Sequence, residues 1–109
     1  AQEAELIKIN AFADVILKAV ENNIEVIDSI LAENARKWSI ERLPKVSLAV
    51  LRLAIGEMKF VDDVPAGVSV NEAVELTKKY GTEDDASYVN GVLGAVIKNV
   101  LPGRTDINE

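Results

Sequence analysis

The chain has 109 residues, of which 49% are hydrophobic, so we expect one globular domain. No run approaches the roughly 20 apolar residues that cross a bilayer, so we expect a cytoplasmic protein without a membrane segment. It contains no cysteine and no histidine, which excludes thiol nucleophiles, the Ser-His-Asp arrangement and zinc sites built from imidazole or thiolate. Its formal net charge of −6 argues against a free-standing, non-specific nucleic-acid binder, whose affinity would come from Lys and Arg on phosphates.

The amino-terminal third of the chain predicts two amphipathic helices. The first covers Ala4–Val20, where apolar residues recur at helical spacing, and Asn22-Asn23 ends it. The second covers Ile24–Trp38 and repeats the pattern. Its residues expected to face water are Glu25, Asp28 and Glu33. Ser39 then offers an N-cap to a short turn that holds Ile40 and Leu43.

A third helix is predicted over Pro44–Phe60, with proline at its first position. Between Val46 and Ile55 only Ser47 and Arg52 are polar, so this helix lacks a wide hydrophilic face and should be central and buried. Gly56 within it costs about 1 kcal/mol relative to alanine. We therefore expect another helix to cross close to the backbone there.

A capping box is predicted at the start of the fourth helix. Ser69 is followed three residues later by Glu72, and this pattern favours a helix that begins near Val70 and ends at Tyr80. Gly81 occupies the position at which a left-handed residue often ends a helix.

The last helix is predicted over Asp85–Leu101, and Pro102 ends it. One face carries Val89, Val92, Leu93, Val96 and Val100, while Gly91, Gly94 and Ala95 are small residues expected to let helices approach. Residues 103–109 have no periodicity and are expected to form a flexible tail. The predicted fold is all-α, a compact bundle of about five helices in a single domain over residues 1–102.

Few side chains suggest chemistry, and each has a structural alternative. Arg52 on the buried helix needs a carboxylate, which Glu57 or Glu72 would supply, and a structural ion pair is favoured over a catalytic one. Trp38 is more easily explained at the edge of the core than as a base-stacking residue. The acidic runs 62–63 and 83–85 match no metal-binding loop, and carboxylates at the start of a helix are favoured by its dipole. No catalytic residue, metal site or cofactor is predicted.

An ordered set of short motifs carries a family resemblance from about Ile7 to Leu93. The motifs are Trp38-Ser39-Ile40-Glu41-Arg42-Leu43, Ala49-Val50-Leu51-Arg52-Leu53-Ala54 with Glu57, Val64-Pro65, Asn71-Glu72-Ala73-Val74-Glu75-Leu76, Lys79-Tyr80-Gly81 and Val89-Asn90-Gly91-Val92-Leu93. In order and spacing they resemble the NusB family of bacterial transcription antitermination factors. The resemblance implies a small all-α protein without catalysis. It also implies binding to boxA-type single-stranded RNA, together with the NusE ribosomal protein, in the RNA polymerase antitermination complex that supports ribosomal RNA transcription.

The resemblance also implies site residues. Asp84, Ser87 and Tyr88 match family positions that approach RNA, with Tyr88 as an aromatic platform for an unpaired base. For Tyr88 the alternative is a half-buried core aromatic. The expected contacts with NusE surround the turn into the central helix, at Glu41, Arg42, Lys45 and Ser47.

Family members carry an arginine-rich segment and further helical stretches before the point where this sequence starts, so we expect a shortened chain that exposes apolar surface and self-associates. Two other hypotheses remain. One is the NusB-like RNA-binding accessory domain of a ribosomal RNA cytosine methyltransferase, although Gly94 follows Leu93 where such enzymes tend to carry arginine. The other is a helical interaction module without an RNA role.

Overall fold

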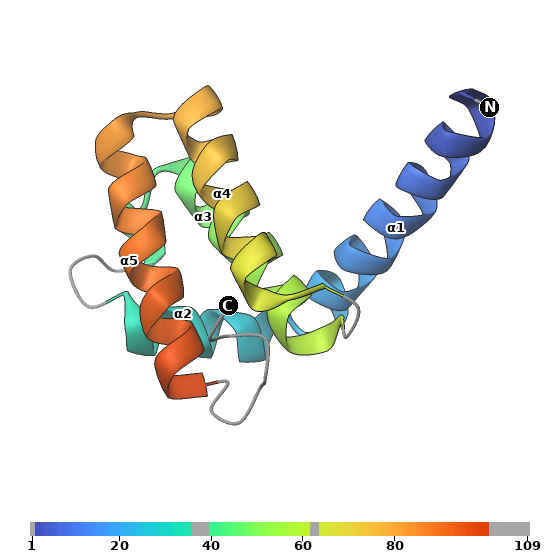
Figure 1. The fold of residues 1–109 in the computed structure, drawn as a ribbon. Helices are drawn as coiled ribbons and strands as arrows, with labels where there is room; N and C mark the ends of the chain where they lie inside the picture. The colour runs from blue at the N-terminus through green and yellow to red at the C-terminus, as the bar shows by residue number, and fades with distance from the viewer. Residues whose placement is uncertain (1, 36–39, 62–63, 101–109) are drawn as a thin grey trace.

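The computed structural model describes residues 2–35, 40–61 and 64–100, and within these ranges it contains helices and no strand (Figure 1). The elements are α1 (Gln2–Asn22), α2 (Ile24–Asn34), the 3₁₀-helix η1 (Ile40–Arg42), α3 (Lys45–Phe60), α4 (Ala66–Tyr80) and α5 (Glu83–Val100). The predicted all-α class is confirmed. The predictions for Trp38, Ser39, the run 62–63, Leu101, Pro102 and the tail 103–109 lie outside the described residues.

Helix α3 is the centre of the fold, as its apolar sequence predicts. It packs against α1, α2, α4 and α5. Leu51 and Ile55 on this helix are completely buried. Pro44 precedes the helix as its N-cap, and the helix begins at Lys45, one residue after the predicted start.

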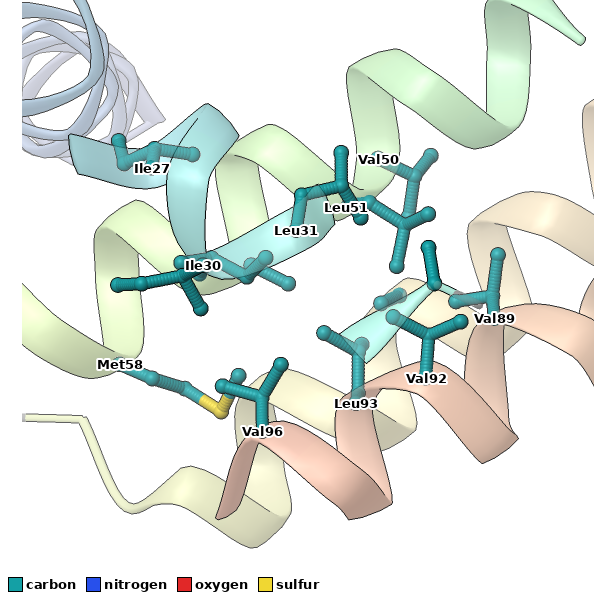
Figure 2. Close-up of a cluster of buried hydrophobic side chains, with 14 of the residues drawn as sticks. Ile27, Ile30, Leu31, Val50, Leu51, Met58, Val89, Val92, Leu93 and Val96 are labelled. Carbon is teal, nitrogen blue, oxygen red and sulfur yellow. The ribbon is translucent and has the colours of Figure 1, made fainter. Parts of the chain in front are cut away.

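The main core lies where α2, α3 and α5 meet (Figure 2). Six of its side chains are 0% exposed: Ile27, Leu31, Leu51, Ile55, Val89 and Leu93. The close-up shows side chains of α2, α3 and α5 pointing toward one another. This core follows from helical spacing, because four of the five residues predicted on the apolar face of the last helix are buried, and only Val100 is partly covered.

Gly56 marks the crossing of α1 and α3. A Cβ atom added to this glycine would lie 2.7 Å from Cγ2 of Val20, closer than such atoms approach. The predicted close approach is confirmed, and the helix that crosses is α1. The rest of α1 is less well covered: its amino-terminal half extends away from the bundle (Figure 1), and Phe12, Val15 and Leu17 are 43%, 53% and 49% exposed.

The predicted capping box at Ser69 and Glu72 is wrong. Helix α4 begins at Ala66, and the Pro65 carbonyl accepts hydrogen bonds from the backbone N–H groups of Val68 (3.0 Å) and Ser69 (3.2 Å). Ser69 therefore lies inside the first turn and is buried. Proline supplies a fixed φ and its carbonyl at this start.

A capping box does occur at the start of α5. The Thr82 hydroxyl accepts a hydrogen bond from the Asp85 backbone N–H at 3.0 Å, and the Asp85 carboxylate accepts one from the Thr82 N–H at 3.2 Å. Gly81, just before it, has φ −129° and is not left-handed, contrary to prediction. Its role is steric, because an added Cβ would lie 3.0 Å from both the Thr77 carbonyl and the Asp85 carboxylate.

Two further predictions about small residues and the fourth helix need correction. Gly91 and Gly94 do not lie at a helix contact, since nothing lies within 4 Å of where their Cβ atoms would be. They face outward, opposite the buried stripe of α5. Tyr80, the last residue predicted for the fourth helix, fits its apolar spacing but is 62% exposed.

Candidate nucleic-acid and partner interfaces

The start of α5 presents the three residues predicted to approach RNA. Asp84, Ser87 and Tyr88 are three and four residues apart and so share one side of the helix. Asp84 and Ser87 are exposed, whereas Tyr88 is partly buried and packs against the core. Gly91 continues the same side one turn later and leaves its backbone open to approach.

Tyr88 combines an apolar contact with a polar end. Burial raises the pKa of its hydroxyl above the ordinary value of 10.0. At neutral pH the side chain is therefore an uncharged phenol whose ring is only partly accessible. This position matches the alternative of a half-buried core aromatic, and the role of Tyr88 toward RNA stays a prediction.

The charge at this end of the molecule is divided between the two helices. The first turn of α5 holds Glu83, Asp84 and Asp85, which suit the positive end of the helix dipole but repel phosphate. The last turn of α4 holds Lys78 and Lys79. The basic residues that precede α5 in the sequence at this end are therefore Lys78 and Lys79 of α4, within five residues of Glu83.

Tyr80 is the aromatic residue at this end that sequence analysis missed as a functional candidate. Its side chain is 62% exposed, and Nζ of Lys79 lies 5.4 Å from the centre of its ring. A solvent-facing ring beside a cation is the combination that stacks an unpaired base and neutralises its phosphate. The available signal was the run Lys78-Lys79-Tyr80 immediately before a helix end.

The predicted partner surface is only partly exposed. Glu41 and Arg42 on η1 and Lys45 in the first turn of α3 are exposed and lie together in the sequence. Ser47 is 1% exposed, so its side chain does not reach that surface, and the prediction of a contact there is wrong. Ser47 lies two residues after Lys45, on the inward side of the helix.

The partner of Arg52 is Asp28 of α2, and not Glu57 or Glu72. The guanidinium donates two hydrogen bonds of 2.9 Å to the two carboxylate oxygens. Both side chains are about two-thirds covered. Asp28 was expected to face water; it is drawn inward because a half-buried guanidinium requires a carboxylate. This pair ties α2 to α3 and supports the structural role.

An open groove lies between α1, α3 and α4. It has a volume of about 280 Å³, and its apolar lining includes Ile16, Leu17, Val50, Leu53, Ala73 and Leu76. Three polar residues, Glu57, Ser69 and Glu72, also line it. Glu57 is only 8% exposed, and one of its carboxylate oxygens accepts a hydrogen bond from the Ser69 hydroxyl.

Among the described residues, no three acidic side chains come together in a way that would hold a metal ion. No helix in the described ranges combines the length and the apolar character needed to cross a membrane.

Comparison with known proteins identifies the family. The model of the NusB family matches residues 1–98 of this chain. The chain belongs to the NusB family. A relative from Clostridium botulinum (strain Loch Maree / Type A3), described as transcription antitermination protein NusB, is 52% identical over 82 residues, which are 75% of this chain and 58% of the relative.

Solved structures agree with this assignment. NusB from T. maritima superimposes with a TM-score of 0.79 and 37% identity, over 84% of this chain and 65% of that one. A crystal structure of antitermination factors NusB and NusE in complex with dsRNA matches with a TM-score of 0.74 and 35% identity, over 81% of this chain and 64% of that one. The chain thus spans somewhat less than two-thirds of the length of these NusB proteins.

Proposed function

We propose that this chain acts in transcription antitermination, where it holds boxA-type single-stranded RNA together with the NusE ribosomal protein in the RNA polymerase antitermination complex of the bacterial cytoplasm. The observation that carries the proposal is the family match over residues 1–98, with curated relatives that bear the name of transcription antitermination protein. The proposed role is binding and not catalysis.

The RNA surface of the proposal is the α4–α5 junction. Asp84 and Ser87 offer an acceptor and a hydroxyl for base edges, and Tyr88 borders them. Tyr80 and Lys79 add an exposed ring and a cation from the end of α4. Such a surface suits one or two unstacked bases and few phosphates, because its other charges are the carboxylates of Glu83–Asp85.

The NusE surface of the proposal is η1 with the first turn of α3. Glu41, Arg42 and Lys45 present charges of both signs there. A ribosomal protein is expected to be basic, and the net charge of −6 on this chain would steer its approach. The association rate should therefore fall as salt rises.

Filter binding of a boxA-type RNA across a salt series tests the RNA surface. Binding by this chain should be weak with a shallow salt dependence, because each phosphate contact adds a slope of only about −0.7 in log affinity against log salt. Tyr80→Ala and Tyr88→Ala should each weaken binding, by an amount consistent with about 1–3 kcal/mol per stacked base, without changing the slope. Lys79→Gln should instead reduce the slope.

Controls separate this proposal from the two other hypotheses. Val26→Ala, an exposed change on α2, should leave RNA binding unchanged. If none of the α4–α5 variants affects binding, the surface is wrongly assigned; if the chain binds neither boxA-type RNA nor NusE at tens of micromolar, the helical interaction module is the better description. The accessory domain of a methyltransferase gains no support from the relatives, which are named for antitermination.

A further inference from the structure

Two residues join α4 to α5, and backbone hydrogen bonds hold this connection at both ends. The Gly81 N–H donates to the Thr77 carbonyl at 2.8 Å and closes the last turn of α4. The Ala86 N–H donates to the Thr82 carbonyl at 3.0 Å and opens the first turn of α5. Gly81 leaves no room for a side chain, because an added Cβ would lie 3.0 Å from the Thr77 carbonyl and from the Asp85 carboxylate. The connection is therefore both short and closely packed.

Asp85 differs from the two acidic residues that precede it in the first turn of α5. Glu83 and Asp84 are exposed, whereas Asp85 is partly covered. Its carboxylate accepts a hydrogen bond from the Thr82 N–H at 3.2 Å, and its own N–H donates to the Thr82 hydroxyl at 3.0 Å. Both bonds join the connection to the helix, so they restrict the first turn of α5 relative to the end of α4. Asp85 thus serves the geometry of the junction, while its neighbours present their charges to solvent.

The two parts of the proposed RNA surface lie on opposite sides of this connection. Lys79 and Tyr80 end α4, and Asp84 and Ser87 lie in the first turns of α5. A strand that contacts both parts binds more tightly when their separation is already set in the free protein, because ordering them on binding costs affinity. We propose that the Thr82–Asp85 capping box positions these two parts, so that its two residues raise RNA affinity without contacting the RNA. This inference rests on the proposed function.

Charge and geometry predict opposite effects at Asp85. A carboxylate near RNA repels phosphate, so removal of its charge alone should strengthen binding by up to about twofold. Asp85→Asn removes the charge but keeps an oxygen that accepts the Thr82 N–H, whereas Asp85→Ala removes both. In filter binding of a boxA-type RNA, Asp85→Asn should match or exceed the affinity of the unmodified chain. Asp85→Ala should bind at least about threefold more weakly than Asp85→Asn, because a frayed first turn lowers the fraction of molecules ready to bind.

Thr82 supplies a second pair of variants and a readout that needs no RNA. Thr82→Ala removes the hydroxyl that accepts from the Asp85 N–H and should weaken RNA binding at least about threefold, whereas Thr82→Ser should restore it to within about twofold. In the free chain, NMR relaxation should give backbone order parameters near about 0.85 for residues 80–84. These values should fall toward about 0.6 in Thr82→Ala and Asp85→Ala and stay high in Thr82→Ser and Asp85→Asn.

Two sets of control variants separate positioning from charge and from stability. Asp28→Asn also removes one carboxylate and breaks a hydrogen-bonded pair, but it does so on α2 and should leave RNA affinity unchanged. Glu83 is an exposed carboxylate beside the box, and the capping hydrogen bonds do not involve it. Glu83→Gln and Glu83→Ala should therefore strengthen RNA binding to the same extent, in contrast to the two Asp85 variants.

Two results would overturn the proposal. The first is equal RNA affinity of Asp85→Asn and Asp85→Ala when circular dichroism shows both to be folded. The second is a set of order parameters for residues 80–84 that Asp85→Ala leaves unchanged. Failure of the proposed function would look different, since the unmodified chain and Asp85→Asn would then both fail to bind the RNA. That result would overturn the role of the box toward RNA as well, whatever the order parameters show.

Discussion

The two sides of helix α3 differ although its sequence is apolar almost throughout. Toward α2 and α5 it joins a closed core in which Leu31, Leu51 and Leu93 are fully buried. Toward α1 and α4 it forms the floor of an open groove with a carboxylate and a hydroxyl in it. A sequence with no polar face thus identifies a central helix, but it does not show which of its sides is covered. Stability should come mainly from the first side.

The largest expected difference between the two sides is at neighbouring leucines of α3. Leu51→Ala removes a fully buried side chain and should lower the free energy of unfolding by about 2–5 kcal/mol. Leu53→Ala, in the groove, should cost less than about 1.5 kcal/mol because its side chain is already partly hydrated. Urea denaturation of both variants measures the difference. Equal losses would mean that the groove side is as well packed as the core.

A second comparison uses glycines. Gly56→Ala places a methyl group 2.7 Å from Val20 and should destabilise the fold by about 1–3 kcal/mol, despite the better helix propensity of alanine. Gly91→Ala meets nothing within 4 Å and should stabilise by about 0.5–1 kcal/mol. Adding Val20→Ala should rescue Gly56→Ala in thermal denaturation. Without that rescue, the cost arises elsewhere than at the α1 crossing.

The capping box of α5 belongs to neither side of α3. Its loss should lower the free energy of unfolding by less than the loss of a buried leucine. Thr82→Ala removes the hydroxyl that accepts from the Asp85 N–H and should cost about 1 kcal/mol. Thr82→Ser keeps the hydroxyl and should cost a few tenths at most. Chemical denaturation compares the two, and an equal cost for both would point to the threonine methyl group instead of the cap.

Two ion pairs that differ in exposure should contribute different amounts to stability, and the more exposed one should contribute least. Asp28→Asn breaks the bidentate pair with Arg52 and should cost about 1 kcal/mol, decreasing in high salt, because both side chains remain about one-third exposed. Glu75→Gln breaks a longer and more exposed contact of 3.9 Å with Lys78 and should cost less than about 0.5 kcal/mol. Melting curves at low and high salt distinguish the two pairs.

Sequence periodicity predicted the helices, the central position of α3 and the close approach at Gly56, because each depends on the order of residues within about one turn. Arg52 was recognised as needing a carboxylate, yet its partner comes from 24 positions earlier, and only the packing of α2 on α3 selects Asp28 over Glu57. Local sequence patterns also gave a wrong prediction where two patterns competed for the start of one helix. Ser69 fits a capping box, but Pro65 starts the helix first and turns Ser69 inward.

The candidate sites were less predictable than the fold. Asp84 and Ser87 were expected to be accessible and they are, but exposure depends on which face of a helix is covered, and Ser47 was misplaced for that reason. Tyr80 shows the converse: it fits the apolar spacing of α4, yet the helix ends where nothing covers it. The α1–α3–α4 groove has no local sequence signal, because its walls come from three separate segments.

At the Gly56 crossing, α1 contacts α3 near one of its ends. Helix α1 has 21 residues, which corresponds to about 30 Å at 1.5 Å per residue, and its contact at Val20 lies close to its carboxyl end. A tilt of about 10° about this contact would displace the amino end of α1 by about 5 Å over that length. The same tilt would move Ile16 and Leu17, which line one wall of the groove, and would thereby change the width of the groove. The absence of a side chain at Gly56 thus permits the close approach that holds this end of α1 against α3.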